Sequence, residues 1–185
     1  NLQIASFATL TVAATTLSGF ISDLAMTLGM IQDNNVEGKV ALDFLKKEGL
    51  NDCGIAGLMG NLYAESGLYS CNLQNSHENK IGYTDVEYTA AVDQNVYNNF
   101  ANDKAGYGLA QWTYPTRKQN LLTFHKKKGV SIGDLETQLE FLVKELKTNY
   151  ATTVWNKLEK AESVLGASNV VLFKFERPSD TSEKV

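Results

Sequence analysis

Apolar residues recur at helical spacing over much of the chain, most clearly between residues 52 and 66. The positions that form this stripe are Ile55, Leu58, Met59, Leu62 and Tyr63. A spacing of three and four residues places them on one face of an α-helix. Asn51 and Asp52 can cap its start through their side-chain oxygens, and Gly67 can end it. The pattern therefore predicts one buried helix over residues 52–66.

The same periodicity predicts further helices near residues 37–47, 85–92 and 115–128. Another is expected after Ser131 and Asp134, which resemble a capping box, and short helices around Trp155 and from Asn169 to Phe175. Residues 69–104 are polar and rich in Asn and Tyr, and we expect them to form one wall of a cleft. The sequence has only two prolines in 185 residues, which also favours helices. The predicted fold class is therefore mainly α. We expect this helical domain to contain a two-sided cleft.

A second stripe on the helix at residues 52–66 consists of small residues. Gly54, Gly57, Gly60 and Ala64 follow one another at spacings of three, three and four. Each interior glycine costs a helix about 0.8–1 kcal/mol relative to alanine. Three glycines on one face therefore predict that another segment packs closely against it.

Glu65 lies in the last turn of this helix, where the helix dipole and an apolar surrounding both disfavour the ionised carboxylate. A single Glu at a helix end is usually a solvated surface residue. Here, however, no other charged residue occurs between Cys53 and Leu68. A carboxyl that stays protonated near neutral pH can act as a general acid in glycoside cleavage, and Glu65 is the candidate for that role.

A glycine- and aromatic-rich segment follows at Gly106-Tyr107-Gly108-Leu109-Ala110-Gln111-Trp112-Thr113, called the strip below. Its glycines permit close approach of a ligand to the backbone. Gln111 can both donate to and accept from sugar hydroxyl and acetamido groups. Tyr107, Trp112 and Tyr114 offer flat apolar faces with polar edges. A turn followed by aromatic residues of the core explains the same residues equally well.

Together these segments resemble the phage tail lysozyme family, which belongs to a superfamily with goose-type lysozymes and lytic transglycosylases. The resemblance rests on Asn61–Leu68 and on Ala105–Thr113, and it covers about four-fifths of the chain, from about Gly38 onwards. Shorter matching pieces are Asn72–Ser76, Asp85–Asp93, Arg117-Lys118-Gln119, Gly129–Leu135 and Phe175-Glu176-Arg177-Pro178.

The resemblance implies a helical lysozyme-like fold that cleaves the bond between N-acetylmuramic acid and N-acetylglucosamine in peptidoglycan. It places Glu65 on the catalytic acid of the superfamily. The residues expected to contact the glycan are Ser66, Tyr107, Gly108, Gln111, Trp112 and Tyr114. Proteins of this family are virion parts that open the bacterial wall during infection, so other phage tail proteins are the expected partners.

Glycoside cleavage usually requires a second carboxylate, and Asp103, three residues before Gly106, is the best candidate. Asp85, Glu87 and Asp93 are weaker ones. An Asx turn leading into the glycines is an alternative role for Asp103. Without a second carboxylate, the lactyl hydroxyl of muramic acid can attack, as in lytic transglycosylases. A catalytically silent tail domain and a cellular lytic enzyme remain as other interpretations.

The composition limits the partners. A formal net charge of −4 and a pI of about 5.2 argue against nucleic-acid binding and give no general attraction to an anionic wall. His77 and His125 stand in no zinc-binding pattern, so no metal or cofactor is expected. Cys53 and Cys71 are expected to be free thiols. A disulfide between them is the alternative, and the distance between the two residues in the fold decides it.

The first 35 residues differ from the rest because they are rich in Thr and Ala and nearly free of charge. We expect an arm over residues 1–35 that packs on this or a neighbouring protein, followed by a catalytic domain over residues 36–185. Contact of the arm with a membrane is the less favoured interpretation, since its polar positions lack Lys and Arg. The charged stretch after Pro178 suggests that the chain is part of a longer polypeptide.

Overall fold

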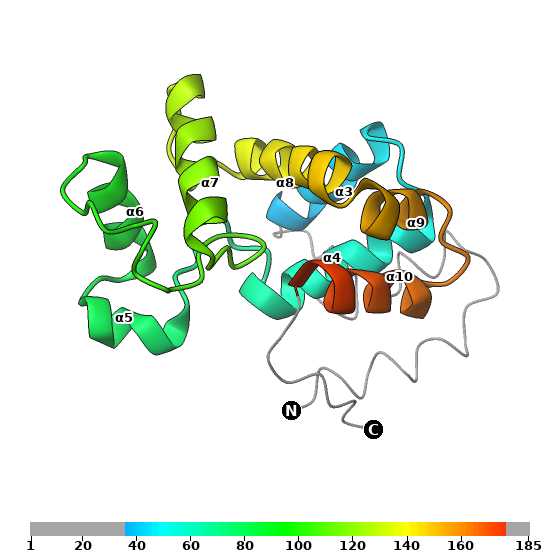
Figure 1. Cartoon of the computed structure of the whole chain (residues 1–185), viewed down its shortest axis with the longest axis horizontal. Coiled ribbons are helices and arrows are strands. Elements are labelled where there is room, and N and C mark those ends of the chain that lie inside the picture. Colours follow the sequence, from blue (N-terminus) through cyan, green and yellow to red (C-terminus); the bar gives the residue numbers. More distant parts are fainter. Residues whose placement is uncertain (1–35, 177–185) are drawn as a thin grey trace. The chain divides into compact units, whose positions relative to one another are not determined.

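The computed structural model describes residues 36–176, which are mainly helical (Figure 1). They form two compact units. Unit 1 contains the described residues up to Asn61 and those from Asn149 onwards, and unit 2 runs from Leu62 to Thr148. The predicted arm at residues 1–35 lies outside the described residues. Within residues 36–176, no helix is both long and apolar enough to cross a membrane.

Unit 1 combines helices from both ends of the described chain. It contains α3 (Val36–Lys47), most of α4 (Asp52–Ser66), and four later elements: η1 (Ala151–Trp155), α9 (Asn156–Glu159), α10 (Val164–Val171) and η2 (Leu172–Glu176). η1 and η2 are single turns of π-helix. The helices predicted at residues 37–47 and 52–66 are confirmed, whereas the last predicted helix begins earlier than expected, at Val164.

The glycine stripe of α4 packs as closely as the sequence predicted. A Cβ atom on Gly54 would lie 2.1 Å from the carbonyl oxygen of Leu158 in α9, and one on Gly57 would lie 2.5 Å from Cβ of Ala167 in α10. One turn further on, Asn61 donates to the carbonyl oxygen of Ser168 at 3.2 Å. The glycines therefore exist because α9 and α10 lie directly on this face of α4.

Unit 2 contains the last turn of α4 and four further helices: α5 (Asn75–Ile81), α6 (Asp85–Asp93), α7 (Pro115–Lys128) and α8, whose residues from Leu135 to Thr148 belong to the unit. α8 as a whole runs from Leu135 to Asn149. α7 has the predicted bounds. α5 was not predicted, because none of its residues is buried and its sequence therefore carries no apolar stripe.

Side-chain caps fix the starts of α6 and α8. Thr84 and Glu87 form a capping box at α6, with the backbone N–H of Glu87 donating to the Thr84 hydroxyl. At α8 the predicted capping box is absent: the Asp134 carboxylate accepts from the backbone N–H of Thr137 at 2.9 Å. The Ser131 hydroxyl accepts instead from Gly133 at 3.1 Å, so Asp134 alone caps the helix.

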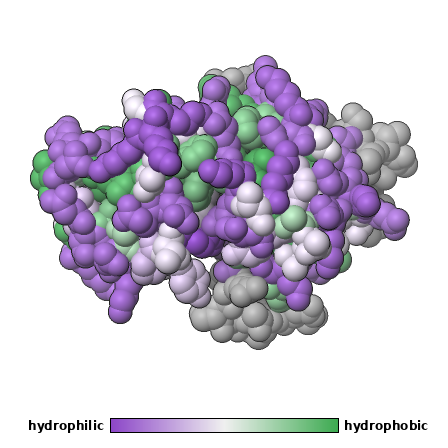
Figure 2. All heavy atoms as spheres, turned by 45° about the horizontal axis from the view of Figure 1, so that its top comes forward, coloured by the Kyte–Doolittle hydropathy of each residue, from purple (hydrophilic) through white to green (hydrophobic). Residues whose placement is uncertain are grey.

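Aromatic rings dominate the interior of unit 2. Tyr88 contacts both Phe100 and Tyr107, with ring centroids 6.0 and 5.5 Å apart, and Trp112 meets Phe141 edge to face at 5.5 Å. By contrast, hydrophilic side chains cover most of the described surface on the face that Figure 2 shows. Because Tyr107 and Trp112 belong to the strip, these ring contacts anchor it in the interior of the unit.

Candidate active site

Glu65 is exposed in the last turn of α4. Its carboxyl has no hydrogen-bond or ion-pair partner among the described residues. Surrounding protein atoms nevertheless withdraw enough water from the carboxyl to raise its pKa by desolvation. Glu65 thus combines access from solvent with a raised pKa, and both properties suit a general acid.

Ser66 connects the end of α4 to the strip. Its side chain is buried, and its hydroxyl lies 3.0 Å from the carbonyl oxygens of both Leu62 and Leu109. The residue next to Glu65 is therefore bonded to the centre of the strip. Ser66 was expected to contact the glycan, but in this structure its hydroxyl faces protein carbonyls.

The strip forms a tight turn between two paired aromatic residues. Tyr107 and Trp112 exchange backbone hydrogen bonds of 3.2 and 3.0 Å, and four residues lie between them. Gly108 has φ +74° and Gln111 has φ +43°. A left-handed glutamine is costly and persists only where surrounding contacts enforce it, so the turn is held in a defined shape.

The three aromatic residues of this region have different surroundings. Tyr107 and Trp112 are fully buried, and the Tyr107 hydroxyl is 2.7 Å from that of Thr89. Their rings belong to the core and present no face to a ligand. Tyr114, which precedes α7, is 65% exposed. Of the three, only Tyr114 has a ring on which a sugar can stack.

Gln111 presents one side of its amide to the protein. Its Nε2 atom donates towards Asn72, with 3.1 Å to the backbone oxygen and 3.0 Å to Oδ1. Its Oε1 atom accepts no hydrogen bond from a described residue. A Cβ atom on Gly106 would lie 2.6 Å from this Oε1, so Gly106 has to be glycine for Gln111 to keep its position.

Three further side chains or carbonyls hold the backbone of the strip. Gln74 accepts from the N–H of Gly106 at 3.0 Å, and its own N–H donates to the Gly106 carbonyl at 2.9 Å. The fully buried Gln138 accepts from the N–H of Leu109 at 2.9 Å. The Asn72 carbonyl accepts from the N–H of Gly108 at 2.8 Å. The strip is thus anchored along its length by groups from distant segments.

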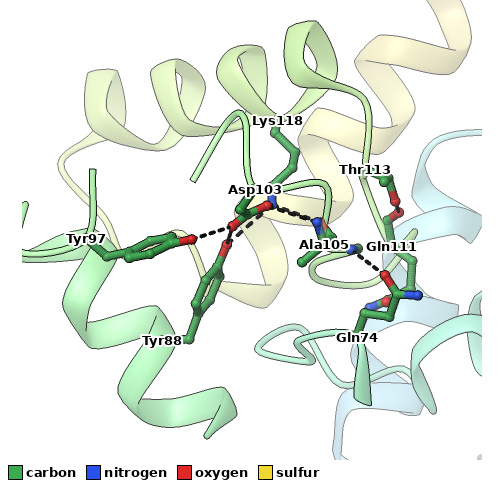
Figure 3. Close-up of polar contacts among 9 residues, drawn as sticks. Gln74, Tyr88, Tyr97, Asp103, Ala105, Gln111, Thr113 and Lys118 are labelled. Atoms are coloured by element: carbon green, nitrogen blue, oxygen red, sulfur yellow. Dashed lines mark hydrogen bonds and ion pairs between the residues drawn. The ribbon is translucent and has the colours of Figure 1, made fainter. Parts of the chain in front are cut away.

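Asp103 is enclosed by partners (Figure 3). Its side chain is 3% exposed. Oδ1 accepts from Lys118 at 2.6 Å and from the backbone N–H of Ala105 at 3.0 Å. Oδ2 accepts from the hydroxyls of Tyr88 and Tyr97 at 2.5 and 3.3 Å. Desolvation and the Asp103 carboxylate raise the pKa of Tyr97 to about 12, which keeps this hydroxyl a donor.

Lys118 received no role from the sequence, although it lies in one of the matching pieces. It is fully buried in α7 and uses its ammonium hydrogens on Asp103, on the Ala105 carbonyl at 2.8 Å and on the Tyr88 hydroxyl at 3.3 Å. Desolvation lowers its pKa, and the bond to Asp103 opposes that shift. A signal existed, because Lys118 shares one helix face with the buried Leu121 and His125.

A second ion pair, between the half-buried Arg117 and the buried Glu145, supports the far end of the strip. The Arg117 guanidinium donates to both oxygens of Glu145 at 2.7 Å, and the indole N–H of Trp112 donates to the same carboxylate at 3.1 Å. This geometry fixes the Trp112 ring within the core. Arg117 and Glu145 therefore help to hold the end of the strip at Trp112.

The other acidic candidates also have partners in the protein. Asp85 accepts from the N–H of Leu73 at 2.7 Å, and Asp93 accepts from that of Ile132 at 2.9 Å. Glu87 accepts from Thr84 at the start of α6. Within residues 36–176, no group of three or more His, Cys, Asp or Glu could hold a metal ion. Cys53 and Cys71 are free thiols.

One family model, described as phage tail lysozyme, matches residues 37–185 of this chain. No curated protein and no solved structure matches the chain. The matched range includes Glu65 and the whole strip, and the helical structure agrees with a lysozyme-like domain. Because the match extends over most of the sequence, the chain belongs to the phage tail lysozyme family.

Proposed function

We propose that this chain is a muramidase of a phage tail that cleaves the glycan strands of peptidoglycan during infection. Family membership makes it a phage lysozyme-like protein with peptidoglycan as its substrate. The bond that is cut and the location in the virion are our inference. The observation that carries the proposal is the exposed, unpartnered carboxyl of Glu65, whose pKa desolvation raises.

In this proposal Glu65 protonates the oxygen that leaves when the glycosidic bond breaks. A carboxyl with a raised pKa keeps its proton at higher pH than an ordinary glutamate, so it can donate where the wall is encountered. The free Oε1 of Gln111 accepts from a sugar hydroxyl or acetamido N–H, and the exposed ring of Tyr114 stacks on a sugar face. Gly108, which was expected to contact the glycan, is buried, and a Cβ atom there would lie 2.6 Å from Oε1 of the buried Gln138; its role is to let the turn close over the core.

Lytic transglycosylase activity is the second candidate, and the surroundings of Asp103 favour it. The Asp103 carboxylate is 3% exposed and accepts from four groups. A carboxylate in this state has no lone pair available for water or for the anomeric carbon. With one accessible carboxyl, the lactyl hydroxyl of muramic acid serves as the nucleophile and Glu65 acts first as acid and then as base.

The decisive experiment compares wild-type protein with Glu65→Gln on purified peptidoglycan and identifies the products by mass spectrometry. The wild type is expected to release glycan fragments, and the variant to lose at least about a hundredfold in rate, because general acid catalysis contributes 10²–10⁴-fold. Reducing muramic acid ends establish hydrolysis, whereas 1,6-anhydro ends establish the transglycosylase.

The matched control is Glu78→Gln, which removes a carboxyl from the surface helix α5. No residue of α5 is buried, so this change is expected to leave the rate unaltered. Both variants are compared at equal folded concentration, checked by circular dichroism. Normal cleavage by Glu65→Gln would disprove its role as the acid, and absence of products from the wild type would favour a silent structural tail domain.

A further inference from the structure

The segment that leads into the strip is held by a buried ion pair whose purpose the chemistry of Glu65 does not explain. Lys118 and Asp103 are 0% and 3% exposed. Burying two charges is expensive, and such a pair is often no more stabilising than apolar residues of similar size. Its presence therefore calls for a reason other than stability.

The pair holds the backbone of one residue, Ala105, at both of its polar groups. The Ala105 N–H donates to Asp103 Oδ1 at 3.0 Å, and the Ala105 carbonyl accepts from Lys118 Nζ at 2.8 Å. Since Lys118 and Asp103 also bond to each other at 2.6 Å, both polar groups of Ala105 are tied to a single ion pair. Figure 3 shows this arrangement, with Tyr88 and Tyr97 reaching the far oxygen of Asp103.

The restraint on Ala105 extends to Gln111 because the next residue, Gly106, lies close to the Gln111 side chain. Ala105 precedes Gly106, and the Gly106 Cα lies so close to Gln111 that an added Cβ would be 2.6 Å from Oε1 and 3.2 Å from Cβ of Gln111. A displacement of the Ala105–Gly106 backbone towards Gln111 would therefore press on the Gln111 side chain. Gln74, which bonds to both polar groups of Gly106, restrains the same backbone from the other side.

The backbone beside the pair is under strain. Lys104 has φ +64°, a left-handed conformation that side-chain-bearing residues rarely adopt. Such residues persist where neighbouring contacts fix them, and they gather at functional sites. The hydrogen bond from the Ala105 N–H to Asp103 spans Lys104 and fixes the backbone on both sides of this exposed residue.

We propose that Lys118 and Asp103 are positioning residues which lock Ala105 and thereby set Gln111 for glycan binding. The lock rests on the proposed function, since it presents Gln111 to the sugar that Glu65 cleaves. It works by preorganisation: the strip has its binding shape before the glycan arrives, so the glycan does not have to order it.

The test uses three variants in a Glu65→Gln background, where the glycan binds without being cut: Asp103→Asn, Lys118→Met, and both together. Each single change leaves a buried charge without its partner and is expected to lower the thermal midpoint. The double change removes both charges and restores part of that loss. It still lacks the bond from Lys118 to the Ala105 carbonyl, so its binding is expected to stay weak.

Binding of a soluble N-acetylglucosamine oligosaccharide is measured by calorimetry, and hydrogen exchange of the strip amides by mass spectrometry. For the double variant we expect affinity to fall by about tenfold, comparable to one misplaced hydrogen bond. Exchange should rise in peptides covering residues 105–111. Leu142→Ala, which cuts back a buried side chain of α8, is the control for lost stability and should leave affinity unchanged.

The outcomes separate the lock from the proposed function. A double variant that binds as tightly as the Glu65→Gln parent, or whose strip amides exchange no faster, overturns the lock alone. Equal loss of affinity in Leu142→Ala also overturns it, because general destabilisation then explains the effect. A Glu65→Gln parent that binds no glycan overturns the proposed function, and the role of the lock in glycan binding falls with it.

Discussion

At the scale of single residues, the surroundings of Glu65 and Asp103 are opposite although both are acidic. Glu65 is exposed and has no partner among the described residues, whereas Asp103 is enclosed by an ammonium group, a backbone N–H and two phenols. Solvent access and free lone pairs decide whether a carboxylate can meet a substrate. These differences favour Glu65 for chemistry and Asp103 for holding the strip.

Glu65→Gln should also change the pH dependence of stability. A raised pKa in the folded state means that the folded protein binds the proton more tightly than the unfolded chain. This contribution is fully present below the ordinary glutamate pKa, about 4.3, and is lost as pH rises through the raised value. Wild type and variant should therefore unfold at similar temperatures near pH 4, and the variant at the higher temperature near pH 8.

Thermal unfolding followed by circular dichroism across this pH range measures the difference. A variant that is less stable than the wild type at the alkaline end would mean that the ionised Glu65 carboxylate is stabilised by the protein. That result would contradict the raised pKa and weaken the assignment of Glu65 as an acid.

At the scale of elements, the two ends of α4 have different roles: the first part packs against other helices and the last turn carries site residues. Its glycine face receives α9 and α10 in unit 1, and its last turn carries Glu65 and Ser66 in unit 2. Gly54 and Gly57 lower the helix propensity of α4 but allow α9 and α10 to pack closely against it. The last turn carries the candidate acid and, through Ser66, is hydrogen-bonded to Leu109 of the strip.

Gly54→Ala should destabilise unit 1 even though alanine is the better helix former. The added Cβ would lie 2.1 Å from the Leu158 carbonyl oxygen, so backbone has to move, and overpacking of this kind costs about 1–3 kcal/mol. Gly166→Ala in α10 is the matched control, because its Cβ would meet no backbone and only one side-chain atom, the capping hydroxyl of Ser163, at 2.9 Å.

Chemical denaturation of both variants measures the two effects. Gly166→Ala is expected to change the free energy of unfolding by less than about 0.5 kcal/mol or to raise it slightly. Equal stability of Gly54→Ala and wild type would show that α9 lies further from α4 than the structure has it.

At the scale of the whole molecule, charge is the informative property. The sequence has 17 Lys and Arg against 21 Asp and Glu, which gives a formal net charge of −4. Peptidoglycan with its attached polymers is also anionic, so long-range electrostatics oppose the encounter. An enzyme delivered to the wall as part of a larger particle does not depend on attraction over distance.

Wall cleavage by the isolated protein should therefore increase with moderate salt. Raising the ionic strength from about 0.01 M to about 0.15 M shortens the Debye length from about 30 Å to about 8 Å and screens the repulsion. Turbidity clearing of purified walls over this range is the measurement. A rate that falls steeply with salt would mean that a local basic surface governs binding and that the net charge is irrelevant.

The sequence alone determined the helices that carry an apolar or glycine stripe, the close contact at Gly54 and Gly57, the family and the position of Glu65. These follow from local periodicity and short motifs, which do not depend on distant residues. The sequence did not predict α5 because all of its side chains lie outside the core. The predicted capping box of Ser131 and Asp134 was wrong, because the Asp134 carboxylate itself caps α8 by accepting from the backbone N–H of Thr137.

Only the tertiary structure decided which side chains of the strip face the protein. Tyr107 and Trp112 could be sugar platforms or core rings on sequence grounds, and burial by α6 and α8 residues makes them core rings. Asp103 could be base or turn residue, and Lys118 from α7 encloses it. Such choices depend on partners far apart in sequence, and one chain read by itself does not reveal which distant residues meet.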